Sequence, residues 1–276
     1  MNECFGRKFV LNGSLMPAEL FDNSMVYEGD SVYEVIRIVK GNPVFFSDHM
    51  DRLEASARIG NKSLLADRQM LIKDFINLSK TEKKKEINLK IVFNYNKGIE
   101  NYLLYFIEPV YPSEEQYIKG VKGILFRAER KEPETKVINH KLRSSIFHRL
   151  ILEGGYEALL VNENGCITEG SRSNIFFLKG ETLTTAPDET VLNGITRKYI
   201  LEICRELKKA VVFRCIPADS ISEFDAVFMT GTSPMVLPFC CIGDVYFQTD
   251  IPLIGKLRMS YLEKTEESIR RFISGA

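Results

Sequence analysis

Strand-type and helix-type segments alternate along the whole chain, and this interleaving most narrows the folds that it can adopt. The segment Val32–Val39 is rich in β-branched and aromatic residues and predicts a strand. A second strand is predicted at Val44–Phe46, after which Ser47 caps a helix over Asp48–Ile59 that ends at Gly60. The mixture predicts an α+β protein.

The same alternation continues to the end of the chain. Two prolines, Pro109 and Pro112, interrupt it, because proline suits neither a helix interior nor a central strand. We therefore predict a smaller domain over residues 1–112, a linker over 113–120 and a larger domain over 121–276, with a cleft between the domains. Further helices are predicted at Arg68–Leu78, Lys141–Leu152, from Gly194 to Leu207 and Leu257–Ile273, and further strands at Asn88–Tyr95, Tyr102–Ile107, Gly123–Arg127, Glu157–Asn162, Cys166–Glu169, Asn174–Leu178, Val211–Phe213 and Ala226–Thr230.

The composition excludes several classes of protein. The chain has 276 residues, and its 37 Lys+Arg balance 37 Asp+Glu, so no net charge attracts it to nucleic acid or anionic lipid. Apolar residues make up 45% of it, which is too many for a disordered chain. The longest apolar runs, such as Val236–Ile242, are too short to cross a bilayer. We expect neither nucleic acid nor a membrane as a partner.

The cysteines and histidines predict a reducing compartment and no structural metal. The 6 cysteines have no Cys-x-x-Cys spacing, and the 3 histidines are spread without the spacing of a zinc site. The adjacent pair Cys240-Cys241 stands in an apolar run and is interpreted as core. The first residues lack a basic start followed by an apolar run, so we expect no signal peptide and a cytoplasmic protein.

Two segments have the chemistry of a phosphate site. Arg52, in His49-x-x-Arg52 on the predicted helix, carries the planar fork that binds phosphate oxygens in pairs, although a surface salt bridge is its commoner role. Gly194 and Thr196 stand where a later helix begins, and the free N–H groups of a helix start attract anions. An ordinary helix start explains the second segment equally simply.

Two further segments and one lysine extend this pattern. The loop Thr230–Ser233 follows a strand and exposes N–H groups that suit phosphate or carboxylate, and a tight turn is its plain alternative. Glu169 ends another strand, where a solvated turn residue is the plain alternative. Together these groups suggest a phosphorylated cofactor with a basic ring nitrogen. Lys136, between a strand and a helix, is the candidate nucleophilic amine, although many lysines lie on surfaces.

Taken in order, these segments resemble the class IV pyridoxal-phosphate aminotransferases of fold type IV. This group holds the branched-chain and D-amino-acid aminotransferases and aminodeoxychorismate lyase. Each motif alone is weak, but the series spans nearly the whole chain in the right order. The motifs are Gly29–Glu34, His49-x-x-Arg52-Leu53, Lys136-x-x-Asn139, Glu157–Leu160, Thr168–Ser171, Asn193–Arg197 and Thr230–Thr232.

The resemblance implies a D-amino-acid-aminotransferase-like fold, pyridoxal 5′-phosphate as the cofactor, and a homodimer that completes each site. Lys136 is then the catalytic residue, which joins the cofactor through a Schiff base and moves the substrate proton. Glu169 keeps the pyridine nitrogen protonated, so that the ring withdraws electrons. The remaining site residues implied are Arg52, Ile195, Thr196 and Thr232 at the phosphate, Tyr33 and Ser233 at the substrate, and Tyr95 in the segment that lines the pocket.

Several positions depart from the family, all on the substrate side. Asn94-Tyr95-Asn96 stands where the lyase and D-amino-acid members have Ser/Thr-Arg-Gly, and no Arg-x-His pair is present. Met235 and Ser31 replace a usual glutamate and glycine. The sequence predicts an aminotransferase that uses an amino acid, with branched-chain ones among the candidates, and a 2-oxo acid. The alternatives are the lyase, which releases 4-aminobenzoate and pyruvate, and a non-catalytic binding protein of this fold.

Overall fold

The computed structural model describes residues 2–130 and 132–275, and the chain divides into two compact units. One unit comprises Met1–Val110, Thr135–Ile138 and Thr265–Ala276, and the other comprises Tyr111–Glu134 and Asn139–Lys264. Both units mix helices with a sheet, so the predicted α+β class is confirmed. No helix within the described residues is long and apolar enough to cross a membrane.

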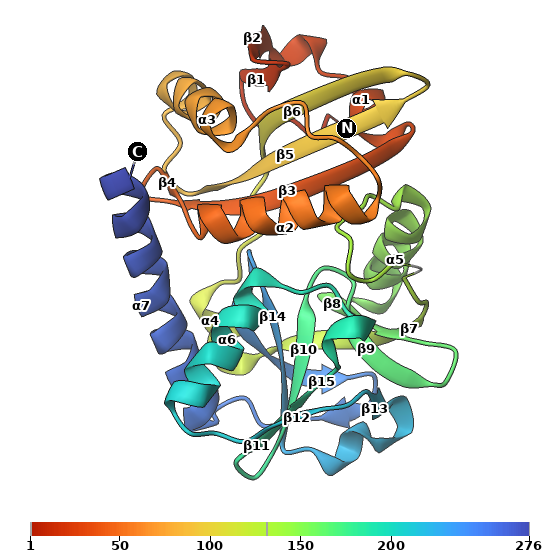
Figure 1. Ribbon diagram of the computed structural model, residues 1–276. Helices are drawn as coiled ribbons and strands as arrows, with labels where there is room; N and C mark the ends of the chain where they lie inside the picture. Colours follow the sequence, from red (N-terminus) through yellow and green to blue (C-terminus); the bar gives the residue numbers. More distant parts are fainter. Residues whose placement is uncertain (1, 131, 276) are drawn as a thin grey trace. The chain divides into compact units, whose positions relative to one another are not determined.

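The first unit is built on a 6-stranded sheet in the order β2-β1-β6-β5-β3-β4, with every neighbouring pair antiparallel. Helix α2 lies along strand β3 (Figure 1). Residues Val32, Ile36 and Ile38 of β3 pack in the same core as Leu53 of α2 because strand side chains alternate between the two faces. The elements are β1 Lys8–Leu11, β2 Ser14–Pro17, β3 Asp30–Val39, β4 Asn42–Pro43, β5 Ile87–Asn96, β6 Ile99–Ile107, α1 Ser24–Tyr27, α2 Phe46–Ile59, α3 Arg68–Glu82 and the 3-10 turn η1 Ala18–Leu20.

The second unit is built on a 10-stranded mixed sheet in the order β12-β11-β10-β14-β15-β7-β8-β9-β13, with β16 paired to β15. Its central strands are buried along most of their length, as expected for strands covered on both faces. The elements are β7 Val121–Arg127, β8 Glu157–Val161, β9 Cys166–Gly170, β10 Asn174–Lys179, β11 Thr182–Thr185, β12 Val211–Phe213, β13 Ile216–Pro217, β14 Ala226–Gly231, β15 Met235–Ile242, β16 Val245–Tyr246, α4 Glu114–Lys119, α5 His140–Glu153, α6 Ile195–Glu206, η2 Asp188–Thr190 and η3 Ala218–Glu223. Helix α7, Pro252–Gly275, belongs to this unit up to Lys264 and to the first unit from Thr265.

Helix α2 begins earlier than the sequence predicts. The predicted strand at Val44–Phe46 is absent, and Ser47 is not the cap, because the helix starts at Phe46 with Phe45 as its N-cap residue. Phe45 adopts a left-handed backbone with φ of 52° and its N–H donates to the Ser268 hydroxyl of α7 at 2.6 Å. A contact with a residue more than two hundred positions away therefore decides where this helix starts.

Two differences concern the predicted domain boundaries. The linker predicted at 113–120 contains helix α4, whose start is fixed by a reciprocal capping box between Ser113 and Gln116. Lys136, predicted in the 121–276 domain, groups with the first unit. The reason is a short antiparallel contact beside β3, in which Tyr33 N–H donates to the Lys136 carbonyl at 3.1 Å and Ile138 N–H donates to the Ser31 carbonyl at 3.1 Å.

Candidate active site

The predicted site residues fall into two sets, one within each unit. Lys136, Arg52, Tyr33 and Tyr95 belong to the first unit. Glu169, Ile195, Thr196, Thr232 and Ser233 belong to the second. In the first set the structure brings Lys136 next to Tyr33, whereas Tyr95 packs against a different core from Tyr33.

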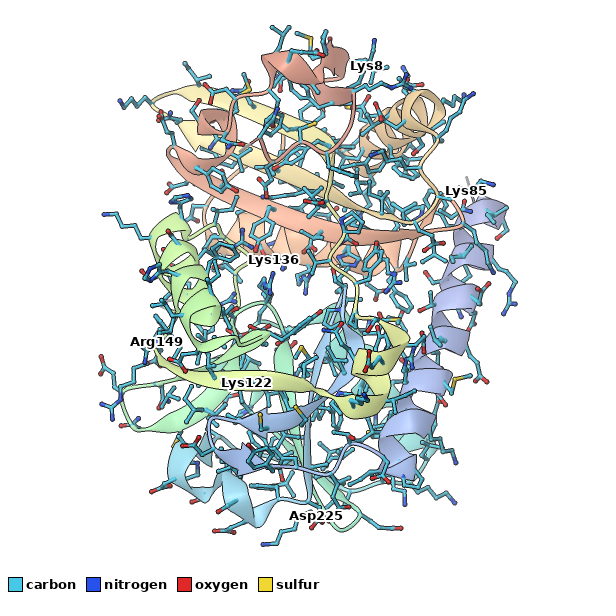
Figure 2. The ribbon with its side chains drawn as sticks, turned by 180° about the vertical axis from the view of Figure 1, so that it is seen from behind. Lys8, Lys85, Lys122, Lys136, Arg149 and Asp225 are labelled. Carbon is cyan, nitrogen blue, oxygen red and sulfur yellow. The ribbon has the colours of Figure 1, made fainter. Side chains whose placement is uncertain are left out.

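Lys136 has a fixed backbone and a half-buried side chain. Its carbonyl accepts from Tyr33 N–H, and its own N–H donates to the Ser56 hydroxyl of α2 at 3.1 Å. The Nζ atom lies 4.9 Å from the centre of the Tyr33 ring, close to strand β3 (Figure 2, where Lys136 is labelled). The amine therefore stands on a rigid support and keeps partial access to solvent, which a nucleophilic lysine requires.

Helix α2 and strand β3, which both bond the backbone of Lys136, also enclose the buried carboxylate of Glu34. The Glu34 side chain is fully buried, and the Arg52 guanidinium donates to its two oxygens through Nε and a terminal nitrogen, each at 2.7 Å. His49 Nδ1 lies 2.7 Å from the same carboxylate, so Nδ1 carries the hydrogen. Residues 49, 52 and 56 are spaced three to four apart, so the helix presents all three on one face.

Charge and burial act against each other in this cluster. Burial favours the neutral form of Glu34, but the charge and hydrogen bonds of Arg52, with those of His49, outweigh it and hold the Glu34 pKa below its ordinary value. Burial lowers the pKa of His49, and the nearby Arg52 and Lys136 charges lower it further, against the opposing pull of Glu34. Glu34 is therefore ionised and His49 neutral at pH 7.

The substrate-side residues of the first unit have structural partners. Asn94 is buried, and its amide donates to the Glu28 carbonyl at 2.7 Å and to the Ser31 hydroxyl at 2.9 Å. The Tyr95 hydroxyl donates to the Ser63 carbonyl at 2.7 Å. Asn94 and Ser31, two of the departures from the family, thus stabilise one turn together.

In the second unit, Glu169 organises a loop. Its carboxylate is buried, lies 3.1 Å from Nε of Arg130, and accepts from the N–H of Leu192 at 3.1 Å. The Leu192 carbonyl accepts from the Asn174 amide at 2.8 Å. The peptide groups before helix α6 are therefore held by strands β9 and β10, which fixes the helix start relative to Glu169.

The start of α6 has the properties of an anion site. Its N-cap residue, Gly194, has no side chain to cap the first turn, so Ile195 and Thr196 present backbone N–H groups there. The Thr196 hydroxyl contacts the Tyr261 hydroxyl at 3.1 Å. Gly194 is also required sterically, since a Cβ at this position would lie 2.0 Å from Asn174 Oδ1.

The loop after β14 lies on the same side of the unit, because Thr230 pairs with Asn174 in the sheet. Thr232 and Ser233 are half-buried in this loop. Met235, at its end, has a left-handed φ of 53°, a conformation that methionine rarely adopts and that marks a constrained turn. The Thr230 hydroxyl is buried and has no hydrogen-bond partner within the described residues.

Sequence reasoning missed two polar residues that shape these sets. Arg130 pairs with Glu169 and donates to the Ser171 carbonyl at 2.9 Å, but nothing in its charged surroundings in the sequence marks it. Glu157 was noted as part of a motif without a role. Its buried carboxylate accepts from Ser171 and Ser173 hydroxyls, and its position at the start of an otherwise apolar strand was the available signal.

Each unit holds groups of a kind that a phosphorylated pyridine cofactor requires. In the second unit, the backbone N–H groups at α6 and the buried hydroxyl of Thr230 suit a phosphate, whereas in the first unit the Arg52 fork is bonded to Glu34. A buried carboxylate at Glu169 suits a protonated ring nitrogen, and Lys136 supplies an amine. No cluster of His, Cys, Asp and Glu suited to a metal ion occurs in residues 2–130 and 132–275.

Comparison with known proteins gives the family. The family model described as amino-transferase class IV matches residues 31–242, and the chain belongs to this family. The curated D-alanine aminotransferase of Bacillus licheniformis is 26% identical over 252 residues, covering 85% of this chain and 88% of that protein. The aminodeoxychorismate lyase of Bacillus subtilis (strain 168) is 22% identical over 241 residues, covering 82% of each.

A solved structure agrees on the fold. The T.th. branched-chain amino acid aminotransferase with pyridoxamine 5′-phosphate superposes with a TM-score of 0.84, at 23% identity and 95% coverage of both chains. The predicted family, fold, enzymatic nature and cofactor, pyridoxal 5′-phosphate, are thereby confirmed. The individual roles predicted for the site residues stay predictions.

Proposed function

We propose that the protein is an aminotransferase that moves an amino group from an amino acid to a 2-oxo acid, with Lys136 as its catalytic amine. The observation that carries this proposal is the setting of Lys136: both of its backbone polar groups are bonded, and its Nζ lies over the Tyr33 ring. The cofactor, when bound, supplies the electron sink, and the lysine holds and returns the substrate proton.

The first unit argues against the substrate sites of both the lyase and the D-amino-acid members. The lyase and D-amino-acid members typically carry an arginine in the turn that is Asn94-Tyr95-Asn96 here. Tyr95 stands at the place of that arginine, and its hydroxyl donates to the Ser63 carbonyl at 2.7 Å, so this turn offers a bonded neutral side chain in place of a carboxylate-binding cation. Branched-chain amino acids are accordingly among the proposed donors.

Colour and mass test the role of Lys136. The purified protein should be yellow, and borohydride should leave one cofactor mass on the peptide that contains Lys136. Lys136→Arg keeps the charge but cannot form the covalent link, so it should lose activity about a thousand-fold or more while keeping its circular dichroism. Lys141→Ala, at an exposed position in α5, is the matched control and should keep activity. An active Lys136→Arg variant would refute the assignment.

A substrate panel separates the two reactions. The holo-protein should convert 2-oxo acids to amino acids when it is mixed with L- or D-amino acids, and the absorbance change identifies the donor and its chirality. Pyruvate release from aminodeoxychorismate without any acceptor is the result that would favour the lyase, as the similarity to the Bacillus subtilis lyase suggests.

We further propose a homodimer that uses the exposed face of α5. Ile146 and Leu150 of this helix are buried, whereas Phe147, Ile151 and Leu152 are each about two-thirds exposed, at 64%, 64% and 65%. Contiguous apolar side chains on a surface mark protein contacts. Light scattering should give twice the chain mass, and Phe147→Ser with Ile151→Ser should halve it. A monomeric wild-type protein would contradict the proposal.

The cytoplasm is the proposed location. The supporting observation is that all six cysteines, which lie within the described residues, are free thiols. Cell fractionation with thiol labelling before lysis tests it, since extracellular thiols react with an impermeant reagent and cytoplasmic ones do not.

A further inference from the structure

A buried lysine in the first unit has no part in the proposed chemistry. Lys90 lies in the middle of β5 with strands β3 and β6 bonded on either side, and its side chain is 1% exposed. A buried ammonium is costly unless a counter-charge and hydrogen bonds compensate it. The counter-charge comes from Glu3, in the irregular segment before β1.

Polar donors converge on the Glu3 carboxylate. Lys90 Nζ donates to its two oxygens at 2.7 and 2.9 Å, and the hydroxyls of Tyr27 and Tyr105 each donate to Oε2 at 2.9 Å. Burial favours the neutral carboxyl, but the Lys90 charge and these hydrogen bonds lower the pKa of Glu3 below its ordinary value. One ammonium and two hydroxyl groups therefore bind the Glu3 carboxylate, and these are donors of the kind that bind a free anion.

Two of the three donors, Lys90 and Tyr105, lie in the sheet, whereas the carboxylate that they hold comes from outside it. Lys90 and Tyr105 are cross-strand partners in the centre of a sheet, and Lys90 Nζ lies 5.3–5.8 Å from the ring centres of Tyr27, Tyr33 and Tyr105. Glu3 belongs to a segment outside helices and strands, and its side chain is 23% exposed. The receptor is therefore preorganised, and its occupant is a side chain from a loop.

We propose that Lys90, Tyr27 and Tyr105 form a carboxylate-binding site that Glu3 fills in the free chain and that a short-chain carboxylate can occupy in its place. The site adjoins Tyr33: Lys90 Nζ lies 5.3 Å from the centre of the Tyr33 ring, and Nζ of Lys136, the candidate catalytic amine, lies 4.9 Å from the same centre. Recognition needs only the cation and the two hydroxyls, and does not depend on the cofactor.

Removing the resident carboxylate tests the site. Glu3→Ala leaves Lys90 without its counter-charge, so the thermal midpoint should fall, and 50 mM formate or acetate should restore about 3 °C or more relative to chloride at equal ionic strength. If the variant folds only poorly, the folded fraction by circular dichroism, in formate against chloride, is the readout. An equal response to formate and chloride would overturn the site.

Three variants show whether the response belongs to this receptor. Glu3→Ala with Lys90→Met removes the cation and should abolish the formate effect. Glu3→Gln fills the space with a neutral amide and should give none. Asp74→Ala removes another buried carboxylate of the same unit, one that accepts from the Tyr102 hydroxyl at 2.9 Å, and should not be rescued. Rescue of all of these alike would mean a general salt effect and would overturn the proposal.

Replacement of Glu3 in the native chain has its own test. Cys4 is 8% exposed, and burial, with the nearby Glu82 charge, raises its pKa to about 11, so its thiol should alkylate slowly. Glutarate at saturating concentration should speed alkylation of Cys4 several-fold, measured by mass on the N-terminal peptide. The buried Cys204 of α6 reports global unfolding and should stay unchanged. Equal Cys4 rates with and without glutarate would overturn the replacement of Glu3.

Discussion

The Glu34 cluster of the first unit and the Glu157 turn of the second hold a buried carboxylate in different ways. In the first unit, Glu34 is bonded by Arg52 and His49, and Glu3 by Lys90, so each carboxylate has a cation beside it. In the second unit, Glu157 accepts from neutral donors: the hydroxyls of Ser171 and Ser173 and the backbone N–H groups of residues 158, 171 and 172.

This difference separates two uses of a buried charge. A carboxylate paired with a cation fixes side chains, and removing one member leaves the other buried and uncompensated. A carboxylate surrounded by N–H and hydroxyl groups fixes the backbone, here the turn between β9 and β10 that follows Glu169. The Glu34 cluster should therefore be the more sensitive to charge and pH, and the Glu157 turn to the loss of single hydrogen bonds.

The largest effect is expected from Glu34→Gln. The substitution keeps the shape but leaves the Arg52 guanidinium, which is 10% exposed, without its counter-charge. Unfolding in urea should show a loss of about 3–5 kcal/mol, as for other broken buried pairs. Arg52→Met with Glu34→Gln should recover part of this loss. A loss below about 1 kcal/mol in the single variant would show that the Glu34–Arg52 pair contributes no more to stability than a solvent-exposed pair does.

Acid should destabilise the chain in two stages. The His49 pKa is lowered in the folded state, so the unfolded chain binds the proton first and stability falls below about pH 6.5. The Glu34 and Glu3 pKa values are also lowered, so the stability that these carboxylates provide is lost as pH falls below about 4.3. The measurement is the free energy of unfolding in urea between pH 7.5 and 3.5.

A substitution assigns the first stage. His49→Asn removes the titrating ring and should flatten the curve between about pH 6.5 and 5, while leaving the later fall in place. A wild-type chain that gains stability on acidification through this range would mean that folding raises the pKa of His49, which contradicts the burial of its ring.

Glu157→Gln should have an intermediate effect. The amide keeps one acceptor oxygen but turns its NH2 group toward donors such as the Ser173 hydroxyl, so one or two hydrogen bonds are lost at a cost of about 1–3 kcal/mol. Because the turn carries Ser171, the hydrogen bond from Arg130 to the Ser171 carbonyl should weaken too, which hydrogen exchange at residues 170–173 would detect. A uniform increase in exchange over the whole unit would instead indicate global destabilisation.

The sequence predicted those parts of the fold that local chemistry decides. The strand Val32–Val39 and the helix at Arg68 lie within β3 and α3, because β-branched runs and helix caps act over a few residues. The start of α2 was wrong, because Phe45 is held by Ser268, and no local pattern records that contact. The short strands β1 and β2 were missed because their pairing, not their composition, makes them strands.

The candidate site shows the same division. Glu169 and the start of α6 were predicted because a strand end and a helix start have local signals. The Arg130–Glu169 and Glu3–Lys90 pairs were not predicted, because each pair joins residues that are distant in sequence and that look like ordinary surface charges. A charge inside an apolar strand, such as Glu34 in β3 or Lys90 in β5, is the one signal available for such pairs, because burial there demands a partner.

The smallest effect should come from an ion pair that neither unit buries. In α4, Lys119 Nζ lies 2.7 Å from Glu115, a distance equal to that in the Lys90–Glu3 pair, but its side chains are 73% and 69% exposed. Water already solvates both charges, so Lys119→Ala should cost about 0.5 kcal/mol or less, and less still in salt. A double-mutant cycle with Glu115→Ala measures the coupling in urea. A coupling near that of the buried pairs would mean that distance alone, and not burial, sets the strength of these contacts, and the contrast between the Glu34 cluster and the Glu157 turn would then need another cause.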